Sequence, residues 1–520
     1  MSSWLSFRDI RTAATSVSAV AGLFIASTGV SAQESGSSLT SNLAVTITPR
    51  ISITETFTDN VRLSSVNQQA EQITEISPGI RIIVNGARLK SYFDYSLSEV
   101  VYAQNSSSRR TLNALNTFGT LEAVNNWAFL DFSGSISRQA ISAFGNPSID
   151  NTSINTNQTE VATYRLSPYV RGRFGDLASY EARYSRTITR SDAAAGAGAT
   201  TSSDAVGRIR GDTAFRNLGW SVDASQQSVD YTAGRPTKND RLSVGLFYTI
   251  TPQLNIFANA GRESNNYTSL DKQSYGTRGF GVRWSPSERT RLSASRDYLS
   301  FGEGHNVSFD HRTGRTAWRF SDIKEVSTTP TQTGITNQGL NYDILYSQFA
   351  SIEPDPVLRA QLVNAFLQAN GINPNATATR GFLTSAVTLT RRQDLLFALL
   401  GVRDTITFIA TRNESRRLDT LSTSVDDLTT SSVVRQRGFS VNYSHRLTPN
   451  YALSVLASQQ NTSGSSSLQD TTLRSVNVNV TGRVGRKSFG SVGARHTIAS
   501  TGGAGSYVEN AVFANLNVQF

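Results

Sequence analysis

The sequence has 520 residues, a formal charge of +10 at neutral pH and no cysteine. The lack of cysteine excludes a disulfide framework, thiolate catalysis and cysteine-ligated metal or iron–sulfur centres, and four histidines are too few to suggest a histidine-rich metal centre. Apolar residues make up 38% of the chain and charged residues only 17%, so small polar residues supply much of the rest. This composition fits a wide β-structure that is wet on one side better than a soluble enzyme.

Residues 1–32 have the organisation of a secretory signal peptide. Arg8 and Arg11 precede an apolar stretch over residues 17–30, and small residues follow as far as Ala32. A positive start, an apolar centre and small residues before the cleavage site define such signals. The apolar stretch is shorter than the roughly 20 residues of a membrane-spanning helix. We therefore expect cleavage after Ala32 and a mature, exported domain over residues 33–520.

From Leu43 onward, apolar and polar residues alternate in segments of about 10 to 16 residues, which is the weak, repeated pattern of a transmembrane β-barrel. The pattern predicts about 22 strands, and short hairpins near residues 301–316 leave a range of roughly 18 to 24. The predicted strands cover residues 43–58, 71–85, 88–104, 113–124, 127–141, 160–173, 177–190, 204–216, 219–231, 240–251, 254–265, 273–285, 289–301, 304–313, 315–327, 385–400, 404–414, 430–447, 450–461, 470–484, 487–499 and 506–520.

Short turns, such as residues 174–176, alternate with longer polar loops, such as residues 142–159. Short periplasmic turns and long external loops are typical of outer-membrane barrels, whereas a propeller or solenoid would repeat one loop pattern at a fixed period. An even strand number also returns both ends of the barrel to the same side. The sequence therefore predicts an all-β fold, a transmembrane antiparallel β-barrel in the cell outer membrane, surrounded by outer-membrane lipid.

The last predicted strand alternates most regularly. Leu516, Val518 and Phe520 lie on one face, with Asn517 and Gln519 between them. We expect this face to act as a C-terminal assembly signal that the barrel assembly machinery recognises.

Residues 328–384 interrupt the strand pattern. They carry the signature of a helix that begins with Asp355 as N-cap and Pro356 in the first turn and ends at Asn370 and Gly371. An apolar helical stripe has to be buried against something. We therefore predict a partly helical insertion on the external side, either inside the lumen as a constriction or plug, or outside as a cap. A solvated surface excursion is the remaining alternative.

The strand number narrows the possible functions. Barrels of about 16 to 18 strands leave aqueous channels, and those of about 22 need a plug or are wide open. The few residues between Gln33 and the first strand are too short for an N-terminal plug domain or a long passenger, so we expect neither. His311 and Asp310 are adjacent in a predicted strand and must point to opposite faces, and no motif gathers Ser, His and Asp for acyl transfer. We expect no enzyme, no cofactor and no metal site.

Arginines alternate with apolar residues on two predicted strands, where Leu166 and Ile209 mark the apolar face. The arginines should therefore face the lumen, where they would concentrate anions, unless they are paired with Asp or Glu on neighbouring strands. Arg186 breaks the alternation, but it is near the external interface, where a long side chain can reach lipid phosphates. The basic residues form no patch with stacking aromatics, so nucleic acid is not an expected partner. The candidate selectivity residues are Arg165, Arg171, Arg173, Arg208 and Arg210.

Residues 51–63 (ISITETFTDNVRL), together with residues 381–393 (GFLTSAVTLTRRQ) and 401–408 (GVRDTITF), resemble the outer-membrane barrel family associated with the PEP-CTERM/exosortase system. The resemblance implies an envelope role linked to exopolysaccharide, with the polymer or its export proteins as partners, and it carries over no catalytic residue. Two hypotheses follow. The chain is a passive channel or export component that prefers anions, or it is a non-conducting structural, assembly or polymer-binding protein.

Overall fold

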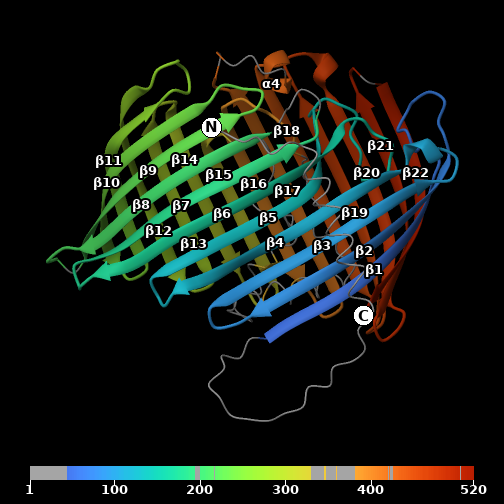
Figure 1. Cartoon of the computed structure of the whole chain (residues 1–520), viewed down its shortest axis with the longest axis horizontal. Coiled ribbons are helices and arrows are strands. Elements are labelled where there is room, and N and C mark those ends of the chain that lie inside the picture. Colours follow the sequence, from blue (N-terminus) through green and yellow to red (C-terminus); the bar gives the residue numbers. More distant parts are fainter. Residues whose placement is uncertain are drawn as a thin grey trace, which may run out of the picture. The chain divides into compact units, whose positions relative to one another are not determined.

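The computed structural model describes residues 44–520 apart from 194–198, 216, 329–344, 347–358, 360–362, 364–380, 420, 422–425 and 504. These residues form a closed antiparallel barrel of 22 strands (Figure 1). Each strand pairs with the next one in the chain, and β22 pairs with β1 to close the ring.

The strands are β1 (Ala44–Thr58), β2 (Glu71–Asn85), β3 (Leu89–Tyr102), β4 (Arg110–Val124), β5 (Ala128–Ala140), β6 (Gln158–Phe174), β7 (Ala178–Ser191), β8 (Thr200–Asp212), β9 (Leu218–Tyr231), β10 (Thr237–Thr251), β11 (Leu254–Asn265), β12 (Gln273–Ser287), β13 (Thr290–Leu299), β14 (Gly302–Arg312), β15 (Thr316–Ser327), β16 (Thr388–Leu400), β17 (Asp404–Arg417), β18 (Val433–Arg446), β19 (Tyr451–Ser463), β20 (Thr471–Arg483), β21 (Ser488–Thr501) and β22 (Gly505–Gln519). The short helices are η2 (Ser106–Ser108), α4 (Asp427–Thr430) and η4 (Ser467–Gln469).

The predicted barrel and its strand number are confirmed, and each predicted strand overlaps one observed strand in the same order. The largest shift is at β8, predicted over 204–216 but observed over Thr200–Asp212. The first residues of β8 are Thr and Ser on both faces, so they carry no alternation of hydropathy. Phe215, which falls within the predicted strand, lies exposed in the turn after β8.

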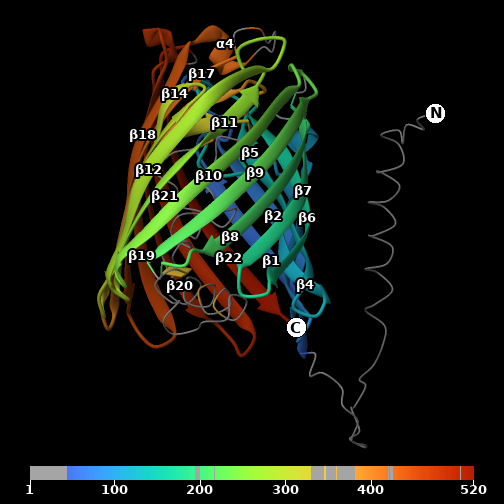
Figure 2. The same ribbon diagram turned by 90° about the vertical axis from the view of Figure 1, so that its left-hand side faces the viewer.

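The strand alternation separates an apolar outer face from a polar inner face. On β10, Leu246 is 53% exposed, and Val244 and Tyr248 on the same face are also exposed. Ser243 and Gly245, on either side of Val244, lie on the other face. The strands of the closed ring are tilted (Figure 2), and large apolar residues are exposed on strands around it. This is the arrangement of a barrel that faces lipid. The polar face then lines the lumen.

The C-terminal strand closes the barrel. β22 pairs with β1 from Arg50↔Gln519 to Thr58↔Ala511. The Phe520 backbone N–H donates to the Pro49 carbonyl at 2.9 Å, which extends this pairing by one bond. The Leu516 and Phe520 side chains are exposed on the lipid face. The predicted apolar face is therefore present, and its role as an assembly signal stays a prediction.

The long helical insertion predicted over residues 328–384 is not supported. Its signature residues Asp355, Pro356, Asn370 and Gly371 lie outside the described residues. The two strands on either side of this segment, β15 and β16, pair directly with each other. Strands therefore account for nearly all of the described fold. No helix within the described residues is long and apolar enough to cross a membrane.

Candidate functional site in the barrel lumen

The arginines predicted to face the lumen lie on the inner face of β6 and β8. On β6, Tyr164 and Leu166 are 42% and 51% exposed on the lipid face, so Arg165 between them points inward. The register places Arg165 opposite Ser133 of β5 and Thr187 of β7. By the same alternation Arg171 and Arg173 of β6 and Arg208 and Arg210 of β8 also face the lumen.

Most of these arginines lack an acidic partner. Arg208 pairs with Asp223 of β9, whereas the Arg165 guanidinium donates to the Ser185 hydroxyl at 3.1 Å. The Arg171 guanidinium lies 4.3 Å from the centre of the Phe129 ring. In the part of the chain that the structure describes, none of Arg165, Arg171, Arg173 and Arg210 forms an ion pair. Of the five predicted arginines, only Arg208 is therefore paired with an acidic residue on a neighbouring strand.

Sequence reasoning missed Arg183 of β7, which belongs to the same wall. Its guanidinium donates to Asp131 at 2.7 Å and to Glu181 at 3.3 Å, and it lies 3.8 Å from the centre of the Tyr169 ring. Glu181 and Arg183 alternate with tyrosines in the sequence, and this signal could have placed them inside. The wall formed by β5 to β9 therefore contains both paired and unpaired arginines.

The loop between β5 and β6, residues 141–157, turns into the barrel; we call it the inner loop. Predicted as part of an external polar loop, it carries apolar side chains that pack on distant parts of the wall. Phe144 packs beside Val434 of β18, which is nearly opposite β5 in the ring. Ile149 packs against Tyr507 of β22, and Ile154 packs against strands β2 and β3. The inner loop therefore crosses the outer mouth of the lumen.

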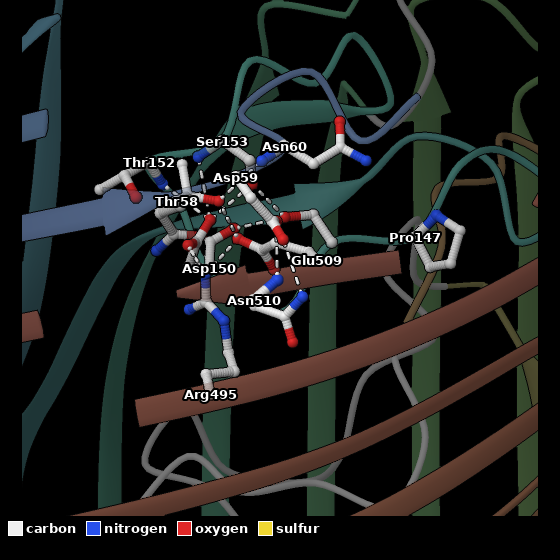
Figure 3. Close-up of polar contacts among 12 residues, drawn as sticks. Thr58, Asp59, Asn60, Pro147, Asp150, Thr152, Ser153, Arg495, Glu509 and Asn510 are labelled. Atoms are coloured by element: carbon white, nitrogen blue, oxygen red, sulfur yellow. Dashed lines mark hydrogen bonds and ion pairs between the residues drawn. The ribbon is translucent and has the colours of Figure 1, made fainter. Parts of the chain in front are cut away.

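A buried cluster of charged groups fixes the tip of the inner loop (Figure 3). Arg495 of β21, whose side chain is 8% exposed, donates to Asp150 of the loop at 2.5 Å and to Glu509 of β22 at 2.7 Å. The Thr58 hydroxyl donates to Glu509 at 3.1 Å. Asp150 also accepts the Ser153 backbone N–H at 2.9 Å, which closes a tight turn in the loop. One cation thus holds two carboxylates, one on the wall and one on the loop.

Hydrogen bonds to the wall extend the attachment on both sides of this cluster. The Tyr102 hydroxyl donates to the Thr152 carbonyl at 2.5 Å, and the Tyr507 hydroxyl donates to the Pro147 carbonyl at 2.6 Å. At the start of the loop, Asp427 accepts the Ser142 hydroxyl at 2.6 Å. The inner loop is therefore attached to wall residues from β3 to β22 and to α4.

Described residues of the segment between β15 and β16 occupy the lumen at a second level. Leu345 and Val363 are fully buried and form one cluster with Ala317 and Ile409, on the inner face of β15 and β17. Phe118 of β4 packs against the same cluster. β4 and β15 are on opposite sides of the ring of 22 strands. The cluster therefore reaches across the lumen, and Leu345 and Val363 lie inside the barrel.

The effect of acid on the attachment of the inner loop follows from the pKa of Asp150. Burial alone would raise the pKa of Asp150, but the Arg495 charge and the Ser153 hydrogen bonds outweigh it and hold this pKa well below its ordinary 3.8. A depressed carboxyl pKa stabilises the folded state above the ordinary value, and this contribution is lost as the pH falls through the folded value. We expect the loop to stay attached from pH 7 down to about pH 4 and to detach only in stronger acid.

Bilayer recordings at stepped pH would check this, with Asp150→Asn as the variant that should lose the acid response. A transition near pH 6 would contradict the assignment.

The pKa of Asp427 shifts in the opposite direction, because burial raises it above 3.8 despite the Ser142 and Ala143 hydrogen bonds. Its contribution is present in acid and falls as the pH rises through the raised value.

The histidines do not gather into a reactive group. His311 contacts Thr290 at 2.8 Å and, as expected, points away from Asp310, which pairs with Arg319. His305 contacts Asp322 at 2.9 Å on the lipid face, a pair that the sequence did not suggest. Within the described ranges, no three His, Asp or Glu side chains are grouped as metal ligands.

Comparison with protein families gives one partial match. The family described as "Protein of unknown function, DUF481" matches residues 193–302, a span that contains β8 to β13 and therefore Arg208 and Arg210. No curated protein matches the chain.

Several solved outer-membrane receptors are similar to the chain at low identity. The FrpB iron transporter from Neisseria meningitidis (F3-3 variant) has 9% identity and a TM-score of 0.47, covering 91% of this chain and 81% of that one. The siderophore receptor PirA from Pseudomonas aeruginosa has 8% identity and a TM-score of 0.42, covering 91% and 80%. The ferric-catecholate import receptor Fiu from E. coli K12 has 6% identity and a TM-score of 0.44, covering 91% and 81%. The likeness concerns the barrel, and nothing about ligands is transferred.

Proposed function

We propose that the chain is an outer-membrane barrel that acts as a passive, anion-preferring channel or export component, with the inner loop holding its outer mouth closed at rest. The observation that carries this proposal is the group of lumen arginines without acidic partners. An unpaired cation on the wall of a lumen raises the local concentration of anions and lowers that of cations. A filled structural barrel would have no need to leave these charges unpaired.

The link to exopolysaccharide is the finer part of the proposal. It is supported by the resemblance of residues 51–63 and 381–408 to barrels of the PEP-CTERM/exosortase system. An acidic polymer would be complementary to the arginine wall, so we propose an acidic exopolysaccharide, or its export proteins, as partner. We propose no catalytic role.

We also propose that the predicted insertion narrows the lumen. Leu345 and Val363 are buried on the inner wall.

A second candidate is a non-conducting structural or polymer-binding protein. Two observations favour it: the inner loop crosses the outer mouth, and the cluster around Leu345 reaches from one wall to the other. In this case external loops, rather than the lumen, would bind the polymer.

Reversal potentials in planar bilayers test the first proposal. Under a KCl gradient, openings of the protein should show anion preference. Replacing Arg165, Arg171, Arg208 and Arg210 by serine should move the reversal potential toward the potassium potential by tens of millivolts, because the lumen loses about four positive charges.

The matched control removes lipid-facing arginines of the same wall, by Arg186→Ser and Arg190→Ser on β7. This variant should leave the reversal potential unchanged. The channel proposal fails if the intact protein, a variant without residues 328–384 and a variant that also lacks residues 143–156 all fail to conduct. Equal selectivity in both arginine variants would show that the lumen charges are screened or paired.

A further inference from the structure

The lipid face of β10 to β14 carries an apolar groove of about 740 Å³. Its lining includes Leu246, Ile256, Ala258, Phe280 and Ala294. By the strand alternation all five point outward, on the same face as the exposed Tyr248. The groove therefore opens to the membrane and not to the lumen, and its volume falls in the range of roughly 300–1,000 Å³ that is usual for small-molecule sites.

Two registered rows of side chains form the groove. One row runs Leu246↔Ala258↔Phe280 across β10, β11 and β12. The row beside it contains Ile256, which faces Val282, and Val282 in turn faces Ala294. Alanine stands between large residues in both rows, so the hollow follows from the missing side-chain volume at these positions.

The first row continues into a basic rim toward the external side. Phe280 faces Arg296 of β13, Arg296 faces His305, His305 faces Lys324 of β15, and Lys324 faces Arg391 of β16. Because the strands tilt (Figure 2), a row across them climbs from the apolar band toward the outer ends of β13 to β16. Arg296 and His305 line the groove itself.

The rim keeps a positive balance. Arg296 pairs with Glu303 at 2.6 Å, and Arg391 pairs with Asp322 at 2.7 Å. Lys324 and Arg391 face each other directly in the register, and like charges at such positions destabilise a sheet. The row continues from Arg391 to Glu414 and Arg435. With the partners on the flanking rows, this part of the lipid face holds five cations, Arg296, Lys324, Arg391, Arg416 and Arg435, against three carboxylates, Glu303, Asp322 and Glu414. An anion between Lys324 and Arg391 would relieve their repulsion.

We propose that this surface is a binding site for one phosphorylated lipid of the outer leaflet. An acyl chain occupies the groove over Ala258 and Ala294, and the head-group phosphate lies against Arg296, Lys324 and Arg391. An apolar groove that ends in cations at the height of the interface matches a lipid with an anionic head. A second copy of the chain fits less well, because a symmetric contact would bring two basic rims together. The site depends on the membrane placement of the barrel and not on conduction through it.

Native mass spectrometry on the delipidated full chain tests the site, with diphosphorylated lipid A as the probe. One lipid should bind the unmodified protein. The groove-filling variant Ala258→Trp with Ala294→Trp should reduce binding at least about tenfold, because the indole rings occupy the space of the lipid acyl chain and remove its apolar contacts. The control Ala457→Trp, on the lipid face of β19, should bind normally. Ala294→Leu alone is a milder filling variant that should give an intermediate loss if the double variant does not fold.

The head-group contact is tested separately. The variant with Lys324→Gln and Arg391→Gln should lose preference for phosphorylated over phosphate-free lipid A, whereas Arg474→Gln on β20 should keep it. Inorganic phosphate at millimolar concentration should not displace the lipid, because phosphate has no acyl chain to occupy the groove. Equal binding of phosphate-free lipid by the unmodified protein, normal binding in the groove-filled variants, or a dimer that disappears when the groove is filled would each overturn the proposal.

Discussion

Replacing Arg495 by leucine is expected to lower the free energy of unfolding by about 3–5 kcal/mol. The guanidinium is 8% exposed and holds Asp150 and Glu509, whose side chain is 4% exposed. Without the cation, two carboxylates remain close together and away from water. The loss is therefore mainly the cost of leaving the carboxylates unpaired and not the value of two hydrogen bonds.

Asp150→Asn provides the contrast within the same cluster. It leaves Arg495 paired with Glu509, so no buried charge loses its partner, and the expected loss is only about 1.5–3 kcal/mol. Arg474→Leu, on the exposed face of neighbouring β20, should change stability by less than about 0.5 kcal/mol. Urea unfolding in detergent micelles, followed by tryptophan fluorescence, would measure all three. Similar losses for Arg495→Leu and Asp150→Asn would show that the cluster is better hydrated than its burial indicates.

The barrel could be predicted from the sequence because lipid imposes one rule on every strand. Each strand must place apolar residues on every second position for the thickness of the membrane, as Val244, Leu246 and Tyr248 do on β10. The rule fails above the apolar band, where both faces of a strand are wet. The start of β8 at Thr200 was missed for this reason.

The lumen arginines could be predicted as inward-facing, but not their pairing. Alternation fixes the face on which a side chain lies, whereas an ion pair also depends on register and rotamer. Arg208 meets Asp223 on the neighbouring strand, and Arg171 meets an aromatic ring instead. Sequence spacing does not distinguish these two outcomes.

The inner loop escaped prediction because its partners are remote in the sequence. Asp150 and Arg495 are 345 positions apart, and no local pattern reports a contact of this kind. A signal was nevertheless present. Phe144, Ile149 and Ile154 recur through a loop whose other residues predict a polar, external segment. Regularly spaced large apolar residues in a long loop indicate that the loop packs against another part of the protein.

Replacing residues 143–156 by the dipeptide Asn-Gly is expected to turn a closed barrel into a conducting one. The substitution is geometrically mild, because the ends of the loop already meet. The Ile141 backbone N–H donates to the Asn157 backbone carbonyl at 3.1 Å, and the Asn157 side-chain Nδ2 donates to the Ser142 carbonyl at 3.0 Å. With Ile141 opposite Asn157, the new connection is the three-residue loop Ser142-Asn-Gly. Three-residue hairpin loops with glycine at the last, left-handed position are common between antiparallel strands, so β5 and β6 should remain paired.

The expected rise in single-channel conductance is at least about tenfold, because a ring of this size has an open lumen once its filling is removed. The matched control shortens the external loop between β19 and β20, where Leu468 is 67% exposed. That variant should conduct like the intact protein. If the inner-loop variant folds and remains closed, the filling must lie at the level of Leu345 and Val363, and removing residues 328–384 in the same background should then open the barrel. A barrel that stays closed after both changes would favour the non-conducting, polymer-binding protein, because no described element would remain to explain the absence of current.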